Sequence, residues 1–403
     1  MREKHLGRRE LLAGAGAAVS LGLAGCTDAV GVGGDENGGG SSDRSGPLDA
    51  TNEADWPMFG ANAERNPVLT GTSGPEGPVR EEWTFESHYV SPSVRDGTVY
   101  VDSSSAYYAL DAATGDVLWE RESESDGSMT PMVTEDALYT FDGGGLTALD
   151  PEDGTHRWTD DTVTGGFPVP RDGVLYGANG DDVFAFDLGD REMRWTSPLE
   201  SEDTADGNYL IDVAADGSHV YTVEGVGEVS AYSLDGGERQ WTLSSAYIDD
   251  STFTLSVAGG TVYLATVLGA SGKPTLRAID ASSGDVQWTD TVGIMSGVTA
   301  DRLYADQKTD DGDDAGVFAL DPATGDRIEE LSGVTSFWGN QPVVADETLY
   351  YSADSGIYAY DLEADEMRWE HTDSHLEIDE LLVAGDRVFF KTGTTLRALG
   401  PAE

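Results

Sequence analysis

Ala109-Leu110-Asp111-Ala112-Ala113-Thr114-Gly115-Asp116-Val117-Leu118-Trp119 is the stretch that decides the fold of this 403-residue chain. After its first residue, Ala109, an aspartate follows two positions later, a glycine six positions later and a tryptophan ten positions later. The alanine-to-tryptophan interval recurs at Ala148/Trp158, Ala185/Trp195, Ala231/Trp241, Ala278/Trp288 and Ala359/Trp369. Ala319 and Ala398 mark two further copies without the tryptophan, so the pattern predicts eight units.

The spacing of these units predicts their internal structure. Successive alanines are 37 to 47 residues apart, a period typical of a four-stranded propeller blade. Upstream of each alanine a valine-rich run contains a tight turn, such as Asp96-Gly97, and Asp-Gly between β-branched and aromatic residues indicates a hairpin. In four repeats a proline precedes the aromatic residue by eight positions, which favours an innermost strand facing the axis, because proline cannot donate to a sheet: Pro92, Pro131, Pro168 and Pro342. We therefore expect an all-β, eight-bladed propeller of four-stranded antiparallel blades.

The repeated tryptophans are interpreted as structural residues that lie on the outermost strand and pack against the next blade. This set consists of Trp83, Trp119, Trp158, Trp195, Trp241, Trp288 and Trp369. Trp83 precedes the first repeat, but Arg80-Glu81-Glu82-Trp83-Thr84 resembles the outer-strand segments around Trp195 and Trp241. The chain ends before the eighth tryptophan would stand. We therefore predict that this N-terminal strand completes the last blade, which closes the ring and removes its open sheet edges.

The N-terminus carries the pattern of an export signal. Arg8-Arg9 is a twin-arginine motif behind a basic start, and the short Ala/Gly/Leu stretch that follows ends at Leu23-Ala24-Gly25-Cys26. This arrangement resembles a Tat signal with a lipobox, in which Cys26 is lipidated and becomes the first mature residue. Residues 26–54, rich in Gly, Ser and Asp, read as a flexible acidic tether. We expect Tat export and lipid anchoring at the extracellular face of the cytoplasmic membrane.

The domain boundaries follow from these patterns. Residues 1–25 are assigned to the signal peptide, 26–54 to the tether, 55–79 to an N-terminal capping segment and 80–403 to the propeller. Within the capping segment, Asp55-Trp56-Pro57-Met58-Phe59-Gly60 is aromatic and turn-prone. This stretch is expected either to plug one end of the ring or to pack under a blade.

The composition is strongly acidic. The 75 Asp and Glu outnumber the 23 Lys and Arg, which gives a formal net charge of −52. Molar salt would screen the resulting self-repulsion, so the balance is typical of proteins from salt-loving archaea. Such a surface repels phosphates, which argues against a nucleic-acid partner. With one cysteine in the chain no internal disulfide can form, and we expect a monomer.

The alanine, aspartate, threonine, glycine and tryptophan at these offsets resemble the repeat of the quinoprotein, or pyrroloquinoline-quinone-like, β-propellers. The first repeat matches at Ala109, Asp111, Thr114, Gly115 and Trp119, whereas the sixth has Glu329 in place of the tryptophan. The compact form with a lipid anchor looks most like the BamB-type scaffold lipoproteins. The repeat identifies the fold more than the activity, because propellers host many functions.

Three functional hypotheses follow from this resemblance. The first is a non-catalytic scaffold or binding module whose partner is an unknown surface or membrane protein. The second is a dehydrogenase of alcohols or sugars that holds pyrroloquinoline quinone and Ca²⁺ in the central funnel. The chain lacks the adjacent cysteine pair of the family's alcohol dehydrogenases, so no cofactor is predicted. The third is a sensor of a small ligand or carbohydrate.

Candidate binding residues are those expected to face the axis at one mouth of the channel, three to four positions before the innermost strand. They are His88, Tyr89, Tyr209, Trp338 and Glu377. Trp338 lies outside the blade pattern, so it is either an exposed aromatic anchor or a filler for the tryptophan missing from repeat six. No catalytic or metal-ligating residue is predicted. Asp310–Asp314 matches a calcium loop only in composition, and the six histidines form no pair at metal spacing.

Overall fold

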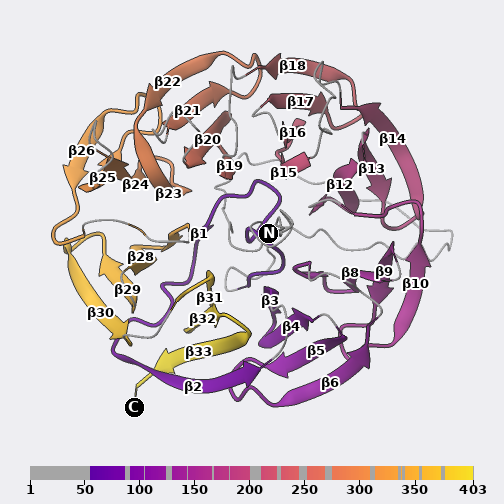
Figure 1. Cartoon of the computed structure of the whole chain (residues 1–403), viewed down its shortest axis with the longest axis horizontal. Helices are drawn as coiled ribbons and strands as arrows, with labels where there is room; N and C mark the ends of the chain where they lie inside the picture. The colour runs from indigo at the N-terminus through magenta and orange to yellow at the C-terminus, as the bar shows by residue number, and fades with distance from the viewer. Residues whose placement is uncertain are drawn as a thin grey trace, which may run out of the picture.

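The computed structural model describes residues 55–402 apart from short stretches, which are 87–90, 104, 124–128, 143, 166–167, 181, 200–209, 225–227, 245–251, 268–274, 309–313, 335–336, 338–340, 354–355 and 374–376. The regular secondary structure of these described residues consists of β-strands alone. They form eight sheets arranged radially around one axis (Figure 1). This arrangement confirms the predicted all-β, eight-bladed propeller. Trp83 lies on an early strand that forms the outer edge of the last blade, as the sequence predicts.

Each of the first four blades consists of four consecutive strands, numbered from the axis outward. Blade 1 contains β3 (Ser91–Arg95), β4 (Thr98–Asp102), β5 (Ala106–Asp111) and β6 (Val117–Glu122). Blade 2 contains β7 (Met132–Val133), β8 (Leu138–Asp142), β9 (Gly145–Leu149) and β10 (His156–Asp160). Blade 3 contains β11 (Val169–Arg171), β12 (Val174–Asn179), β13 (Asp182–Asp187) and β14 (Glu192–Pro198). Blade 4 contains β15 (Leu210–Ala215), β16 (His219–Glu224), β17 (Val229–Ser233) and β18 (Arg239–Leu243).

The other four blades repeat this plan with two additions from the N-terminal part of the chain. Blade 5 contains β19 (Thr252–Ala258), β20 (Thr261–Val267), β21 (Thr275–Asp280) and β22 (Val286–Asp290). Blade 6 contains β23 (Val292–Val298), β24 (Leu303–Lys308), β25 (Asp314–Leu320) and β26 (Arg327–Glu330). Blade 7 contains β27 (Val343–Ala345), β28 (Thr348–Ala353), β29 (Gly356–Asp361) and β30 (Glu366–Thr372). The early strand β1 (Val68–Leu69) pairs with β27 on the side of the axis. Blade 8 contains β31 (Glu380–Ala384), β32 (Arg387–Thr392) and β33 (Thr395–Pro401), with β2 (Val79–Glu86) outside them.

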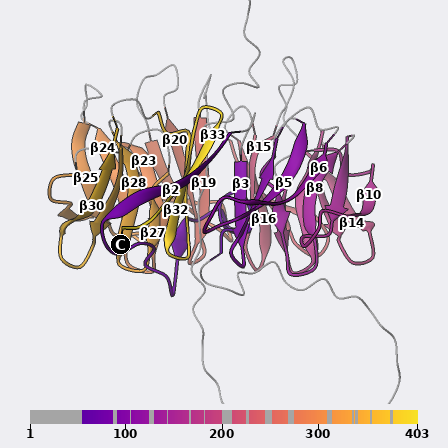
Figure 2. The same cartoon turned by 90° about the horizontal axis from the view of Figure 1, so that it is seen from below.

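The antiparallel order of the strands distinguishes the two faces of the ring. The chain turns from first to second strand and from third to fourth strand on one face, which we call the lower face. The turn from second to third strand lies on the opposite, upper face. Figure 2 shows the ring from the side with the upper face at the top. The innermost strands therefore end at the lower face.

The lower-face turns have the backbone conformations that their residues favour. Asp96 and Gly97, between β3 and β4, have φ values of 48° and 75°, as a two-residue type I′ turn requires. Between β5 and β6, Asp111 Oδ1 accepts hydrogen bonds of 2.9 Å from the backbone N–H groups of Ala113 and Thr114. The repeat aspartate therefore holds this turn as an Asx turn. Gly115 follows it with φ of 72°, a conformation that glycine adopts without strain.

Each repeat tryptophan lies on an outermost strand and contacts the next blade. The indole N–H of Trp119 donates to the carbonyl of Pro151 at 3.0 Å, and a Cβ at Gly154 would lie 2.8 Å from the Trp119 ring. The repeat glycine is therefore needed for the close approach of the indole as well as for its backbone angle. The same contact occurs between Trp83 and Gly115, Trp195 and Gly237, Trp241 and Gly284, and Trp288 and Gly325.

Three seams between blades lack this tryptophan–glycine contact, and at the seam of blades 7 and 8 the Trp369 N–H donates instead to the carbonyl of Pro75 at 2.7 Å. At the seam of blades 2 and 3 the glycine position holds Arg191, whose guanidinium lies 5.7 Å from the centre of the Trp158 ring. At the seam of blades 6 and 7 the tryptophan position holds Glu329, and Asp365 stands at the glycine position. The Asp365 carboxylate accepts hydrogen bonds from the backbone N–H of Ser332 at 3.2 Å and from its hydroxyl at 2.7 Å. The loss of the indole is thus matched by a change on the blade that would receive it.

The ring is closed by an N-terminal strand, as the sequence predicts. β2 pairs antiparallel with β33 from Val79 opposite Pro401 to Glu86 opposite Thr395. Figure 1 shows the two strands side by side at the rim, β2 in indigo and β33 in yellow. The Trp83 indole N–H donates to the carbonyl of Ala112 at 3.0 Å, which joins blade 8 to blade 1.

Blade 7 differs from the predicted four strands because β1 adds a fifth. β1 pairs parallel with the innermost strand β27, with Val68 opposite Val344 and Leu69 opposite Ala345. A parallel neighbour is possible here because β1 comes from a distant part of the chain and needs no local crossover. The strand belongs to the segment that crosses the channel.

Candidate functional site

Most of the predicted channel residues lie outside the described residues. His88, Tyr89, Tyr209 and Trp338 fall in the stretches left out, so both interpretations of Trp338 stay predictions. Glu377 is described, and it lies exposed between β30 and β31, on the connection at the upper face. The signal motif Arg8-Arg9 and the predicted lipidation residue Cys26 also lie outside the described residues.

The lower mouth of the channel is crossed by residues 55–75. Figure 1 shows this indigo segment running through the middle of the ring. It exchanges backbone hydrogen bonds with β3, where Trp56 N donates to Val94 O at 2.8 Å and Val94 N to Trp56 O at 2.7 Å. It then contacts the lower ends of the inner strands of the other blades, through Val133, Ala215, Val257, Val298, Val344 and the ion pair of Glu64 with Arg171. At blade 8 the Thr72 hydroxyl donates to Gly385 O at 2.9 Å.

This segment satisfies backbone groups that a bare propeller axis would leave unpaired. The innermost strand of a blade is a sheet edge, and buried edge N–H and C=O groups need partners. Ala63 O and Glu64 O accept from Ala215 N and Val257 N at 2.7 and 2.9 Å. The channel is therefore lined at its lower end by the chain's own early residues.

Arg65 is the buried ionic centre of the segment. Its side chain is 2 % exposed, and its Nε lies 3.0 Å from the carbonyl of Val213 and 3.1 Å from the carboxylate of Asp212. The guanidinium also donates to the carbonyl of Phe59 and lies 4.7 Å from the centre of the Phe59 ring. Burial lowers the pKa of Arg65 and raises that of Asp212, and each charge opposes the shift of the other. The pair ties the segment to blade 4.

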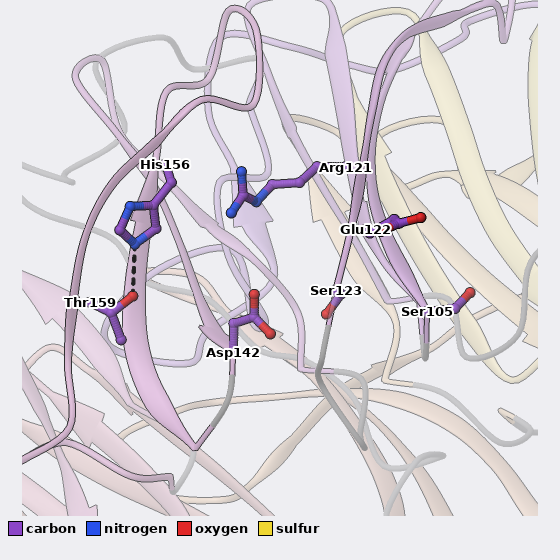
Figure 3. Close-up of a pocket in the computed structure, with 7 residues that line it drawn as sticks. All are labelled: Ser105, Arg121, Glu122, Ser123, Asp142, His156 and Thr159. Atoms are coloured by element: carbon purple, nitrogen blue, oxygen red, sulfur yellow. Dashed lines mark hydrogen bonds between the residues drawn. The ribbon is translucent and has the colours of Figure 1, made fainter.

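A second polar region lies near the upper face, between blades 1 and 2. A hollow of about 540 Å³ is lined by Ser105, Arg121, Glu122, Ser123, Asp142, His156 and Thr159. These residues come from β6 with the residue that follows it and the β4–β5 turn of blade 1, and from β8 and β10 of blade 2. Figure 3 shows Arg121, Asp142 and His156 around the same space, with the hydrogen bond of 2.9 Å between His156 Nε2 and Thr159 Oγ1. The hollow is thus polar and carries charges of both signs.

Arg121 is the unusual member of this lining. Its Nε is buried and has no hydrogen-bond partner, and the described residues give it no ion pair. Most other arginines of the described ring pair with carboxylates, as Arg194 does with Asp187 at 2.6 Å and Arg387 with Glu82 at 2.8 Å. An unpaired buried donor costs free energy, about 1–3 kcal/mol. In a chain so rich in carboxylates, a guanidinium without one is a feature that the fold does not explain.

A buried carboxyl group lies behind this hollow, at the upper end of β4. Asp102 is 0 % exposed, and its Oδ2 accepts from the Thr140 hydroxyl at 3.4 Å and from Met129 N at 3.3 Å. Its Oδ1 has no partner among the described residues. Burial, reinforced by the charge of Asp142, raises the pKa of Asp102 to about 8. Asp102 is therefore protonated at neutral pH.

Blade 4 holds a second buried acid near the upper face. Glu224, at the end of β16, is 1 % exposed and neither carboxylate oxygen has a partner among the described residues. Burial and the charge of Glu228 raise the pKa of Glu224 to about 7. The Tyr232 hydroxyl and Thr222 Oγ1 are also buried without partners. The upper half of the ring thus carries buried polar groups that its own fold leaves incompletely satisfied.

Sequence reasoning missed Asp102 and Arg121, although one signal was available. Two positions after the repeat aromatic, four blades carry an apolar residue, whereas blades 1 and 6 carry Asp102 and Asp306, blade 7 carries Ser352 and blade 8 carries Lys391. A buried charged residue at a repeat position that is apolar in half of the blades indicates a role that packing alone does not explain. Arg121 gave no such signal, because outer strands are polar throughout.

The described residues contain no group of three or more His, Cys, Asp and Glu side chains placed to hold a metal ion. Nor do these residues form any helix with the length and hydropathy of a membrane span.

Comparison with known proteins gives one family match. The model of the family described as outer membrane protein assembly factor BamB matches residues 72–209, 142–246 and 179–399, which together span most of the chain. The BamB of Yersinia pestis is 24 % identical over 279 residues, which cover 65 % of this chain and 68 % of that protein.

Two other similarities extend the comparison. The serine/threonine-protein kinase AfsK of Streptomyces coelicolor is 27 % identical over 177 residues, which cover 43 % of this chain and 20 % of the kinase. The chain thus spans about a fifth of the length of that relative. The quinohemoprotein alcohol dehydrogenase ADHIIG of Pseudomonas putida superposes with a TM-score of 0.61 at 15 % identity, over 87 % of this chain and 81 % of that structure. At this identity the likeness concerns the fold alone.

Proposed function

The chain belongs to the family described as outer membrane protein assembly factor BamB, and from this premise we propose that it is a non-catalytic protein-interaction scaffold held at the cell surface by a lipid. Its partner would be a surface or membrane protein that docks on the ring. The proposed anchor is Cys26, reached after export through the Arg8-Arg9 signal. The assembly role printed in the family's description belongs to the relatives, and only the mode of action is carried over.

The observation that supports this proposal most is the closed lower mouth. Residues 55–75 contact all eight blades at the lower face and bury Arg65 there. A partner that uses the channel mouth therefore has to approach from the upper face. A rigid ring suits a docking platform, because little conformational entropy is lost when a partner binds.

The path of the chain suggests how the ring is oriented. Asp55 lies at the lower face, where its carboxylate accepts a hydrogen bond of 3.0 Å from Asp96 N. The predicted tether leads from Cys26 to this point. We therefore infer that the lower face is turned toward the membrane and the upper face toward the partner.

The anchor is tested by fractionating cells that produce variants of the full chain. Cys26→Ser should release the exported protein into the medium, and Arg8→Lys with Arg9→Lys should hold it inside the cell. Membrane-bound Cys26→Ser protein would contradict the lipid anchor. Two acyl or alkyl chains are expected on Cys26, because one chain gives only marginal membrane binding.

The docking face is tested by photo-crosslinking from one residue on each face in intact membranes. A photoreactive amino acid in place of Glu377 probes the upper face, and one in place of the exposed Glu152, in the lower-face turn between β9 and β10, is the matched control. Crosslinks to one defined protein from position 377 and none from 152 are expected. Crosslinks confined to position 152 would contradict the proposal, as would stoichiometric uptake of quinone and Ca²⁺ with alcohol oxidation.

A further inference from the structure

Four polar side chains of blade 4 lie on one side of its sheet, toward the upper face. In the pairing of β16 with β17, Thr222 stands opposite Ser230, and Tyr232 follows two positions after Ser230 on the same side. Glu224, two positions after Thr222, also points to this side, because successive residues of a strand alternate. All four side chains are at most 1 % exposed. We call Thr222, Glu224, Ser230 and Tyr232 the blade 4 patch.

The side of the sheet that carries this patch faces blade 3. Tyr232 belongs to one buried apolar cluster together with residues of that blade, which include Ala178, Val183 and Leu199. Val223, on the other side of β16, packs instead with residues of blade 5. The patch is thus enclosed in the seam of blades 3 and 4, against a wall that is largely apolar.

The blade 4 patch does not satisfy its own hydrogen bonds. Both carboxylate oxygens of Glu224, the Tyr232 hydroxyl and Thr222 Oγ1 have no partner among the described residues. Burial without hydrogen bonds disfavours an ionised carboxylate much more than the neutral acid. Burial, reinforced by the charge of Glu228, therefore raises the pKa of Glu224 to about 7.

Two charges of blade 4 act on Glu224 within the described residues. That of Glu228 opposes ionisation, and that of Arg239, on β18, favours it without cancelling the effect of burial. Tyr232 stays neutral, because burial and the charge of Glu224 raise its pKa to about 12. A charge on Glu224 is therefore relieved best by water. The path to water is short, since Glu224 is the last residue of β16, at the upper face.

We propose that the seam of blades 3 and 4 is a proton-controlled switch: it is closed while Glu224 is protonated, and the upper ends of β16 and β17 open to water when Glu224 is ionised. In the open form the carboxyl group regains an ordinary pKa near 4.5. The equilibrium constant for opening therefore rises between pH 4.5 and pH 7, by up to about tenfold per pH unit, and levels off above pH 7. The switch belongs to the ring alone and does not depend on the proposed scaffold role.

The test is amide hydrogen exchange of the full chain in molar KCl at pH 5, 6 and 7, with rates corrected for the intrinsic pH dependence of exchange. The amides at the upper ends of β16 and β17 should lose protection at least tenfold, on the order of the linkage effect, between pH 5 and pH 7. This loss should exceed that of the β28 amides in blade 7, which report opening of the whole ring.

Variants then assign the effect to one carboxyl group. Glu224→Gln keeps the size of the side chain but cannot ionise, so its blade 4 amides should be equally protected at pH 5 and pH 7. Asp102→Asn is the matched control, because it removes a buried carboxyl group from blade 1 and should leave the pH dependence in blade 4 as in the parent protein. Equal protection of the parent at both pH values would overturn the proposal, and so would an unchanged pH dependence in Glu224→Gln.

Discussion

The lower and upper halves of this ring follow different rules. At the lower face the repeat is obeyed almost everywhere: Asx turns, indoles seated on glycines, and a segment that pairs with the ends of the inner strands. Near the upper face the repeat is broken by single charged residues such as Asp102, Arg121 and Glu224, each of which has at least one buried polar atom without a hydrogen-bond partner among the described residues. The contrast teaches that the lower half carries the architecture, although buried atoms without a hydrogen-bond partner occur there too, at Asp55 Oδ2 and Asn62 Oδ1.

The largest effect is expected at an indole of the lower half. Trp241 is 9 % exposed and its N–H donates to Ala281 O at 2.9 Å. Trp241→Ala should lower the free energy of unfolding by about 4 kcal/mol, because a large cavity opens between two blades. Trp158→Ala is the internal comparison: Trp158 is only partly buried and rests against Arg191, so its loss should cost clearly less. Chemical denaturation at constant molar KCl measures both free energies of unfolding. Equal losses of stability would refute the role given to the glycine that the indole packs against.

The next effect concerns the segment that closes the lower mouth. Arg65→Met removes the cationic partner of the Asp212 carboxylate and the side-chain donor to the carbonyls of Val213 and Phe59. Breaking a buried pair from one side is costly, and a loss of about 3 kcal/mol is expected. Adding Asp212→Leu should recover part of the lost free energy of unfolding. A variant as stable as the parent would show that the segment is not anchored through Arg65.

The upper half is tested through the pH dependence of stability. Folded Asp102, with a pKa of about 8, holds its proton at pH values where the unfolded carboxyl, with a pKa of 3.8, has lost it. Unfolding therefore releases a proton, and this residue lowers stability progressively as pH rises from about 4 to about 8. Between pH 5 and pH 7, the free energy of unfolding of Asp102→Asn should therefore rise by about 2 kcal/mol relative to that of the parent protein. Parallel stability–pH curves for the two proteins would contradict this reading.

The smallest effect sharpens the comparison within the lower half. Glu329→Trp alone should not stabilise the chain, because Asp365 occupies the position where the indole needs glycine. With Asp365→Gly added, the seam of blades 6 and 7 resembles its neighbours, and a favourable coupling of about 1 kcal/mol is expected from the double-mutant cycle. A coupling near zero would mean that Ser332 and its hydrogen bonds already fill the seam as well as an indole would.

The sequence predicted the parts of this molecule that repeat. Eight copies of one pattern determine blade number, turn positions and the outer-strand place of Trp119 and its equivalents, and the similarity of the segment around Trp83 to those outer strands predicted the closure. The fifth strand in blade 7 and the ion pair of Arg65 with Asp212 could not be predicted, because they join residues 147 positions apart or more through one or two contacts.

The site was predicted less well for the same reason. The residues chosen at the upper mouth came from counting along the repeat, and of these the structure describes only Glu377, which is exposed. The hollow around Arg121 arises where two neighbouring blades meet, and no period in the sequence marks such a meeting. Localisation, anchor and halophilic character stay predictions from residues 1–54 and from the charge.

The central claim is that one early stretch of chain closes the ring. It is tested most directly by a disulfide between Glu86→Cys and Thr395→Cys, directly opposite each other in β2 and β33, in a Cys26→Ser background that contains no other cysteine. Mass spectrometry of the oxidised, digested protein should find these two peptides linked in near-quantitative yield. Glu86→Cys with Pro401→Cys, at opposite ends of the strand pair, should stay unlinked. Failure of the first pair to link, or equal linkage of both, would contradict the closure.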